Sequence, residues 1–225
     1  RRKSQHLCGF SGLFIGHYLL VTCVKCIPML NYSIILGEIN IYNTFNLHKI
    51  FNHKITGNVS YYVNRNDLDW GIANWMFCPE TMPKLPFYFC DIPFDIPLAN
   101  TDKLDNLTCD GQFINIQTPT IIQNLYILAF AEWADVYDNI ELIYADDSIE
   151  KKEITVYDVI TPYMWDFNIN IETCTPAFTV RLSSREIGVI YVNKICMNKE
   201  KKLHKIHLPL NPLLHIFSIT YEVTK

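Results

Sequence analysis

The sequence predicts an all-β protein folded as a two-layer antiparallel β-sandwich. From about residue 31 onward, short apolar segments are separated by turn residues about every ten positions, a spacing typical of sandwich strands. No segment carries a sustained helical stripe of apolar residues between a capping residue and a terminal glycine. Prolines, which cannot donate to a strand ladder, gather between the apolar segments, as at Pro79, Pro83 and Pro86.

Two stretches in the middle of the chain predict specific strands. Residues 125–131, LYILAFA, are continuously apolar, as expected of a central strand covered on both faces. Residues 139–157 form two strand-like halves around Asp146, Asp147 and Ser148, which predicts a hairpin with its turn at these residues.

The last strand is predicted from a clean alternation over residues 217–223. Apolar and aromatic side chains occupy every second position, and the positions between them are polar. This pattern predicts a half-buried strand with one face on a core and the other in solvent. The inward residues would be Phe217, Ile219, Tyr221 and Val223.

The chain is predicted to have an N-terminal extension at 1–41 and one sandwich module at 42–225. The extension opens on the basic residues RRK, and no charged residue occurs from Leu7 to Val24. This order fits a signal peptide, a membrane anchor or a non-native upstream segment, and the sequence leaves the three open. The compartment stays undecided, although the apolar run favours a secreted or cell-surface location, with membrane contact only if the run is an anchor.

The charge balance and the glycine content exclude two classes of partner. The formal net charge is −4, so no basic field is available for nucleic acid. Neither GxGxxG nor GxxxxGK[ST] occurs among the eight glycines, which argues against a phosphate-cradling loop. We therefore expect no nucleic-acid partner and no nucleotide cofactor.

The cysteines and histidines do not form a recognisable metal motif. Cys23 and Cys26 are the one closely spaced cysteine pair, whereas a structural zinc site needs four ligands. His204 and His207 lie three apart, and on a strand such positions point to opposite faces. His215 shares the parity of Phe217, which favours a core or rim position. We expect no metal, no cofactor and buried free thiols.

The best candidate for a binding site is the polar, aromatic span at 61–80, with a second candidate in the loop at Trp133. Sugars are held by aromatic faces against their C–H patches and by carboxylate, amide and guanidinium groups on their hydroxyls. Loops at the end of a rigid sandwich would display such groups. The alternative is that the tryptophans cap the core. The predicted ligand-binding residues are Asn64, Arg65, Asp67, Asp69, Trp70, Trp75 and Trp133; no catalytic residue is predicted.

Three stretches resemble a known class of module. They are NLHKIFNHKIT at 46–56, the block FCDIPFDIPLANTDKLDNLTCDGQFINI at 89–116 with the hairpin that follows it, and IHLPLNPLLHIFSITYEV at 206–223. Together they resemble the galactose-binding-like jelly-roll domains found beside bacterial glycoside hydrolases such as fucosidases and mannosidases. One departure is Asp147, which stands at the hairpin turn where these modules usually have glycine. Asp147 must therefore tolerate a positive φ, which aspartate does better than most residues.

The resemblance implies a jelly-roll fold, a glycan or sugar ligand and a glycoside hydrolase as a partner protein. The fold is implied far more specifically than the function, because one fold hosts many tasks. Our leading hypothesis is a non-catalytic carbohydrate-binding accessory module. The alternatives are a small carbohydrate-active enzyme that uses loop carboxylates such as Asp67 and Asp69, and a structural sandwich that packs on a protein partner.

Overall fold

The computed structural model describes residues 40–57, 76–98, 103–160, 173–182 and 187–224. All of them belong to a compact unit that spans Glu38–Lys225. The predicted extension at 1–41 lies outside the described residues except for Asn40 and Ile41, which belong to the first strand. No helix in the described ranges is long and apolar enough to cross a membrane.

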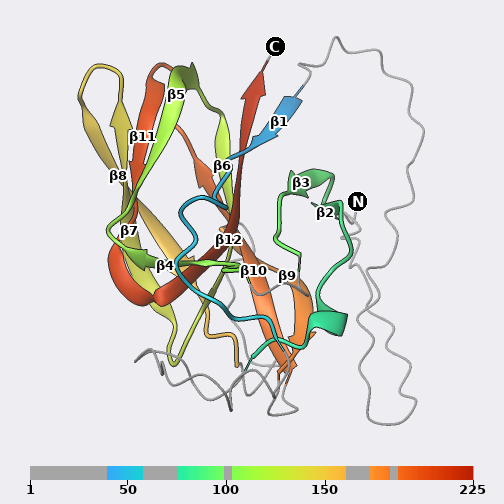
Figure 1. Cartoon of the computed structure of the whole chain (residues 1–225). Coiled ribbons are helices and arrows are strands. Elements are labelled where there is room, and N and C mark those ends of the chain that lie inside the picture. Colours follow the sequence, from blue (N-terminus) through green and yellow to red (C-terminus); the bar gives the residue numbers. More distant parts are fainter. Residues whose placement is uncertain (1–39, 58–75, 99–102, 161–172, 183–186, 225) are drawn as a thin grey trace, which may run out of the picture. The chain divides into compact units, whose positions relative to one another are not determined.

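The described residues form an antiparallel β-sandwich, as the sequence predicts (Figure 1). One sheet has six strands in the order β1-β12-β6-β10-β9, and β4 also pairs with β12. Their bounds are Asn40–Thr44 for β1, Leu107–Asp110 for β4, Asn124–Ala131 for β6, Cys174–Arg181 for β9, Ile187–Cys196 for β10 and Leu210–Thr224 for β12. The strands of this sheet pair antiparallel throughout.

The second sheet has four strands in the order β5-β11-β7-β8. Their bounds are Phe113–Ile121 for β5, Val136–Tyr144 for β7, Ile149–Val156 for β8 and Lys202–His207 for β11. The predicted hairpin is confirmed as β7–β8, and its turn residue Asp147 has the expected positive φ, 60°. The Asp146 carboxylate accepts a 3.1 Å hydrogen bond from the Ser148 amide and so closes the turn.

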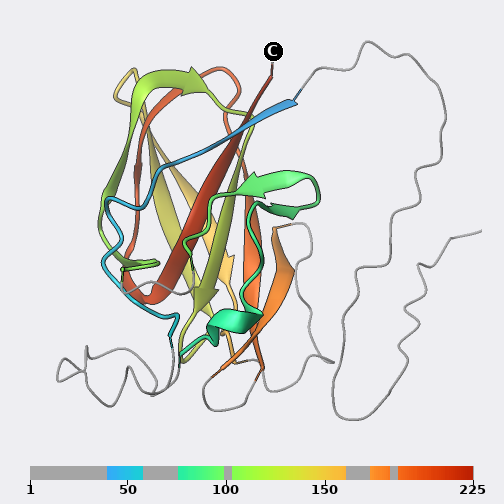
Figure 2. The ribbon, with the colours of Figure 1, turned by 45° about the vertical axis from the view of Figure 1, so that its right-hand side comes forward.

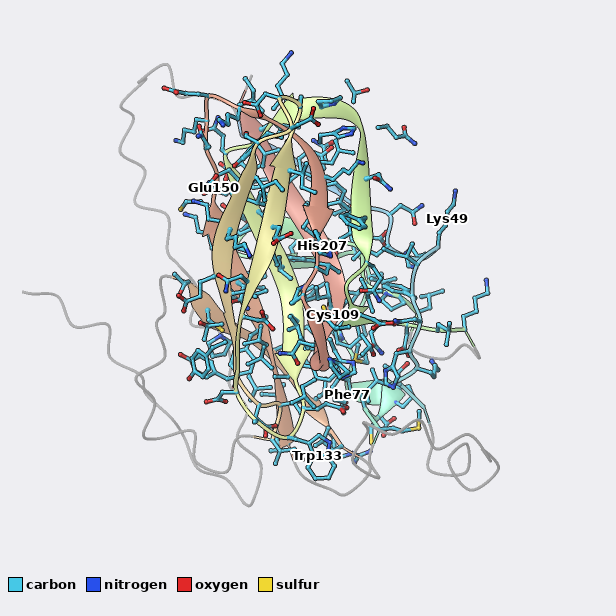
Figure 3. The ribbon with its side chains drawn as sticks, turned by 90° about the vertical axis from the view of Figure 1, so that its left-hand side faces the viewer. Lys49, Phe77, Cys109, Trp133, Glu150 and His207 are labelled. Carbon is cyan, nitrogen blue, oxygen red and sulfur yellow. The ribbon has the colours of Figure 1, made fainter. Side chains whose placement is uncertain are left out.

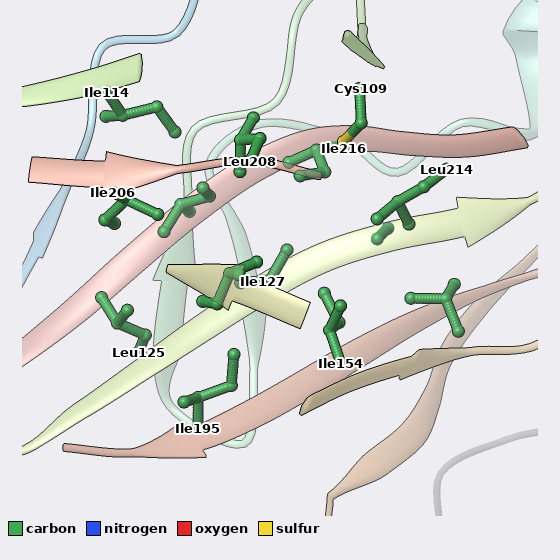
Figure 4. Close-up of a cluster of buried hydrophobic side chains, with 14 of the residues drawn as sticks. Cys109, Ile114, Leu125, Ile127, Ile154, Ile195, Ile206, Leu208, Leu214 and Ile216 are labelled. Carbon is green, nitrogen blue, oxygen red and sulfur yellow. The ribbon is translucent and has the colours of Figure 1, made fainter. Parts of the chain in front are cut away.

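The main core lies between the two sheets (Figure 4). Leu125 and Ile127 of β6 meet Ile114 of β5 and Ile206 of β11 in this layer. Figure 4 shows these side chains directed into the space between the strands. Side chains alternate between the two faces of a strand, so each sheet presents one apolar face to the other. The burial of these two faces is the ordinary basis of sandwich stability.

A second apolar layer covers the other face of the six-stranded sheet. In this layer Phe130 of β6 and Phe217 of β12 pack with two phenylalanines from the chain around the β2–β3 hairpin. Phe77 precedes the hairpin, and Phe94 is its last residue. That hairpin comprises Phe87–Phe89 and Ile92–Phe94, and a short 3-10 helix at Pro79–Thr81 comes before it. Figures 1 and 2 show the hairpin on the side of the six-stranded sheet away from β5, β7, β8 and β11. The prediction that residues 125–131 are covered on both faces is therefore confirmed.

The prediction of a half-buried last strand with one inward face is wrong in two respects. The register of β12 shifts between Ile216 and Ser218, so Phe217 packs in the second layer while Ile219 packs in the main core. The polar face is also buried, because Ser218 and Thr220 bond to the segment around the hairpin. The Thr220 hydroxyl, for example, donates to the Pro93 carbonyl oxygen at 2.5 Å. A β-bulge thus lets one strand serve two cores.

Candidate functional site

Six of the seven predicted ligand-binding residues belong to one span of the chain, residues 64–75. Asn64, Arg65, Asp67, Asp69, Trp70 and Trp75 lie outside the described residues. The seventh predicted residue, Trp133, is among the described residues and lies in the loop between β6 and β7.

Trp133 stands on the surface at one end of the sandwich (Figure 3). Its side chain is 66% exposed, so it does not cap the core, which was the alternative interpretation. The preceding residue, Glu132, is fully buried, and the chain turns outward at Trp133 through a left-handed backbone with φ of 69°. This conformation is unfavourable for a bulky residue.

A polar and an aromatic residue follow Trp133 along the chain, Asp135 in the same loop and Tyr137 at the start of β7. The Asp135 carboxylate accepts a 2.9 Å hydrogen bond from the Asp158 amide, which ties the loop to the chain after β8. Tyr137 is also exposed, and local desolvation together with the charge and hydrogen bond of Asp135 raises its pKa. We call Trp133, Asp135 and Tyr137 the Trp133 platform.

A buried polar network lies directly behind the loop, and the sequence did not predict it. Asp105 is its hub: its carboxylate accepts from the Lys54 ammonium at 2.7 Å, from the Ile55 amide at 2.9 Å and from the Thr56 amide at 3.0 Å. Lys54 and Asp105 are both almost fully buried, so this is an ion pair inside the protein. The bonds fix residues 54–56 against the segment that precedes β4.

The network continues from Asp105 to two histidines. The Asn106 side-chain amide donates to Asp105 at 2.9 Å, and its oxygen lies 3.1 Å from Nδ1 of His53 and 2.9 Å from Nδ1 of His215. The His215 ring stacks on Phe130 at 4.6 Å between centroids. Nε2 of His215 lies 3.7 Å from the Glu132 carboxylate.

Burial shifts the pKa values of these groups so that they are neutral near pH 7. Desolvation raises the pKa of Glu132 to about 8, although a charge on His53 would lower it. Desolvation lowers the pKa of His53 to about 4, helped by repulsion from His215, and lowers the pKa of His215 to about 3. The contact between Glu132 and His215 is therefore an approach of two neutral groups and not a salt bridge.

One sequence feature could have pointed to this network. Glu132 directly follows the apolar strand at 125–131. Carboxylates are rarely buried, so a glutamate at the end of a buried apolar strand is unusual. His53 and Asn106 carry no comparable signal, because ordinary loop sequences surround them. The expectation that His215 is a core histidine is confirmed.

The remaining histidine and cysteine predictions concern metals and thiols. His207 stacks on Phe113 at 4.4 Å and contacts Glu141 at 2.9 Å on the exposed face of the four-stranded sheet. Among the described residues, no group of three histidine, cysteine or acidic side chains is arranged to hold a metal ion. Cys109 and Cys174 are buried free thiols, as expected, but Cys90 and Cys196 are exposed.

Comparison with known families agrees with the fold. A model of the AziU2-like β-sandwich domain family matches residues 47–225, which is most of the chain and includes every strand from β2 to β12. The chain therefore belongs to the AziU2-like β-sandwich domain family. No curated protein matches it.

Proposed function

We propose that this AziU2-like β-sandwich domain is a non-catalytic carbohydrate-binding module that holds a glycan on the Trp133 platform. The observation that carries the proposal is the outward position of Trp133 at the end of a rigid sandwich. An exposed indole offers a flat apolar face to the C–H patch of a pyranose, and a rigid scaffold lowers the entropy lost on binding.

The polar members of the platform suit the hydroxyl groups of a sugar. The Asp135 carboxylate has acceptor capacity beyond its bond to the Asp158 amide, since a carboxylate offers about four lone-pair sites. Tyr137 follows Trp133 by four residues and is exposed to a similar extent, 65% against 66%. One aromatic face beside adjacent donors and acceptors is the composition of a small-sugar site.

The loop residues Asn64, Arg65, Asp67, Asp69, Trp70 and Trp75 stay predicted ligands of the same glycan. A bacterial glycoside hydrolase stays the proposed partner protein, on the strength of the sequence resemblance. No observation on the described residues favours the enzyme that would use Asp67 and Asp69, or the purely structural module.

Glycan-array screening followed by calorimetry with the best-binding sugar tests the proposal. Trp133→Ala should weaken binding about tenfold, or roughly 1–2 kcal/mol, because it removes one aromatic–sugar contact. It should leave the melting temperature nearly unchanged, since the ring is exposed. Trp70→Ala and Trp75→Ala test the second loop in the same assay.

The matched control is Tyr88→Ala, which removes an exposed aromatic ring (58%) from β2, outside the β6–β7 loop. This variant should bind the sugar as the wild type does. An array without any bound glycan, or equal binding by the Trp133→Ala variant, would overturn the proposal.

A further inference from the structure

Glu132 stands at the point where the chain leaves strand β6 and enters the β6–β7 loop. β6 ends at Ala131, and Glu132 is fully buried, whereas the next residue, Trp133, is exposed on the surface (Figure 3). The Glu132 amide donates to the Leu213 carbonyl oxygen of β12 at 3.0 Å. Glu132 therefore anchors the start of the loop, because its main chain is bonded to the sheet and its side chain lies inside the protein.

The side chain of this anchor is buried without a hydrogen bond. Neither carboxyl oxygen of Glu132 has a hydrogen-bond partner among the described residues. Nε2 of His215 lies 3.7 Å from the carboxyl group, beyond the usual 2.7–3.2 Å range of a hydrogen bond. An unpaired buried charge costs far more free energy than an unpaired neutral group, so this position suits the protonated acid and not the carboxylate.

The hydrogen bonds of Asn106 determine which face His215 turns to Glu132. The Asn106 amide nitrogen donates to the Asp105 carboxylate at 2.9 Å, so its oxygen faces Nδ1 of His215, also at 2.9 Å. Because that oxygen is an acceptor, the neutral ring carries its hydrogen on Nδ1 and a bare lone pair on Nε2. A Glu132 carboxylate would therefore face another acceptor, whereas the protonated acid presents a hydrogen to the lone pair.

The other titratable groups around Glu132 supply no positive charge among the described residues. Burial lowers the pKa of His53 to about 4, so this ring is neutral near pH 7 as well. The pKa of Asp158 is raised by burial and, to a smaller extent, by neighbouring acids that include Glu132. Asp105, whose charge acts on both histidines, is paired with Lys54. An ionised Glu132 would thus lie near a second acid and without a cation.

We propose that the β6–β7 loop is a proton-controlled switch with Glu132 as its sensor. With its proton, Glu132 stays in the core and the start of the loop stays bonded to β12. Without it, the carboxylate moves into water and the hydrogen bond between the Glu132 amide and Leu213 breaks, which frees the part of the loop that carries Trp133. Any effect on glycan binding rests on the proposed function of the Trp133 platform, whereas the switch itself does not.

The switch should open as the pH rises toward 8. The pKa of Glu132 is about 8 in the closed loop, against an ordinary value of 4.5 in water. Between these values the opening of the loop releases one proton. The equilibrium constant for opening should therefore rise about tenfold per pH unit in this window and level off above pH 8.

Amide hydrogen exchange of the full chain, without any sugar, measures this opening. The Glu132 amide should be less protected than the amide of Leu128, which belongs to the same strand between β10 and β12, because the loop opens without global unfolding. Between pH 6 and 8 the protection factor at Glu132 should fall about a hundredfold. In Glu132→Gln the protection factor at this position should stay constant, because glutamine keeps the shape, can donate to His215 and cannot ionise.

Three results would overturn the proposal. Equal protection of the Glu132 and Leu128 amides would show that the loop opens only when the whole domain unfolds. A constant protection factor at Glu132 in the wild type would show that no proton controls the opening. The same fall in the Glu132→Gln variant would assign the effect to another group. The wild-type chain decides the first two results even if the variant does not fold, and none of the three depends on a bound glycan.

Discussion

Glu132 should make the protein less stable as the pH rises from mildly acidic to mildly alkaline. In the folded state its pKa is about 8, against an ordinary value of 4.5. Between these values the unfolded chain releases the proton while the folded chain retains it. Unfolding therefore becomes easier with rising pH. The stabilisation is complete below pH 4.5 and is lost as the pH approaches 8.

The magnitude follows from the width of that window. A difference of 8 minus 4.5, or 3.5 pH units, at about 1.36 kcal/mol per unit corresponds to roughly 4–5 kcal/mol across the whole range. The histidines act in the opposite direction, because their pKa values of about 4 and 3 lie below the ordinary 6.5. They cost stability as the pH falls below 6.5. The contribution of this network is therefore largest near pH 6.5.

Glu132→Gln isolates the effect, because glutamine keeps the shape of the side chain and cannot ionise. Between pH 6.5 and 8 the histidine contribution is constant, so the wild type should lose about 2 kcal/mol relative to the variant. Urea unfolding followed by tryptophan fluorescence at half-unit pH steps measures this difference.

The control is Glu153→Gln, which removes an exposed carboxylate from β8. Its unfolding free energy should run parallel to that of the wild type across the range. Parallel curves for the Glu132→Gln variant as well would refute the assignment of Glu132 as a buried neutral acid.

Two further substitutions test the buried ion pair and the backbone at Trp133. Lys54→Met removes the counterion of the buried Asp105 carboxylate and should cost about 3–5 kcal/mol in urea unfolding. Lys151→Met, at the exposed pair with Glu141, should change the unfolding free energy little, and equal effects of the two substitutions would contradict this account. Trp133→Gly should raise the unfolding free energy by about 0.5–1 kcal/mol, because glycine adopts a positive φ without strain. The same variant should bind the glycan more weakly. A clear loss of stability would contradict this prediction and show that the indole packs on the protein.

Local features were readable from the sequence wherever one segment decides its own structure. The unbroken apolar run at 125–131 predicted a strand covered on both faces, and the Asp146–Ser148 cluster predicted the β7–β8 turn, including the positive φ of Asp147. The spacing of short strands predicted the sandwich, because strand period and turn chemistry are properties of neighbouring residues. The motif order that resembles galactose-binding-like domains pointed to the same fold.

The tertiary structure alone decided whether two other parts of the chain are covered. The alternation at 217–223 predicted a solvent face, but the β2–β3 segment covers it, and the bulge after Ile216 moves Phe217 into the second layer. The sequence was compatible with Trp133 as a core cap or as an exposed ring, and the structure shows that the residue is exposed. Periodicity in the sequence shows which side chains share one face of a strand, but it does not show what covers that face.

The buried network is the clearest case of what the sequence could not reveal. Asn106 meets His53 across 53 residues and His215 across 109, and Glu132 comes from a fourth segment. None of these residues lies in a local pattern that anticipates the others. Their pKa values arise from desolvation, which depends on every chain segment packed around them. The sequence therefore determined the strands, while long-range packing decided which polar groups were buried together and left neutral.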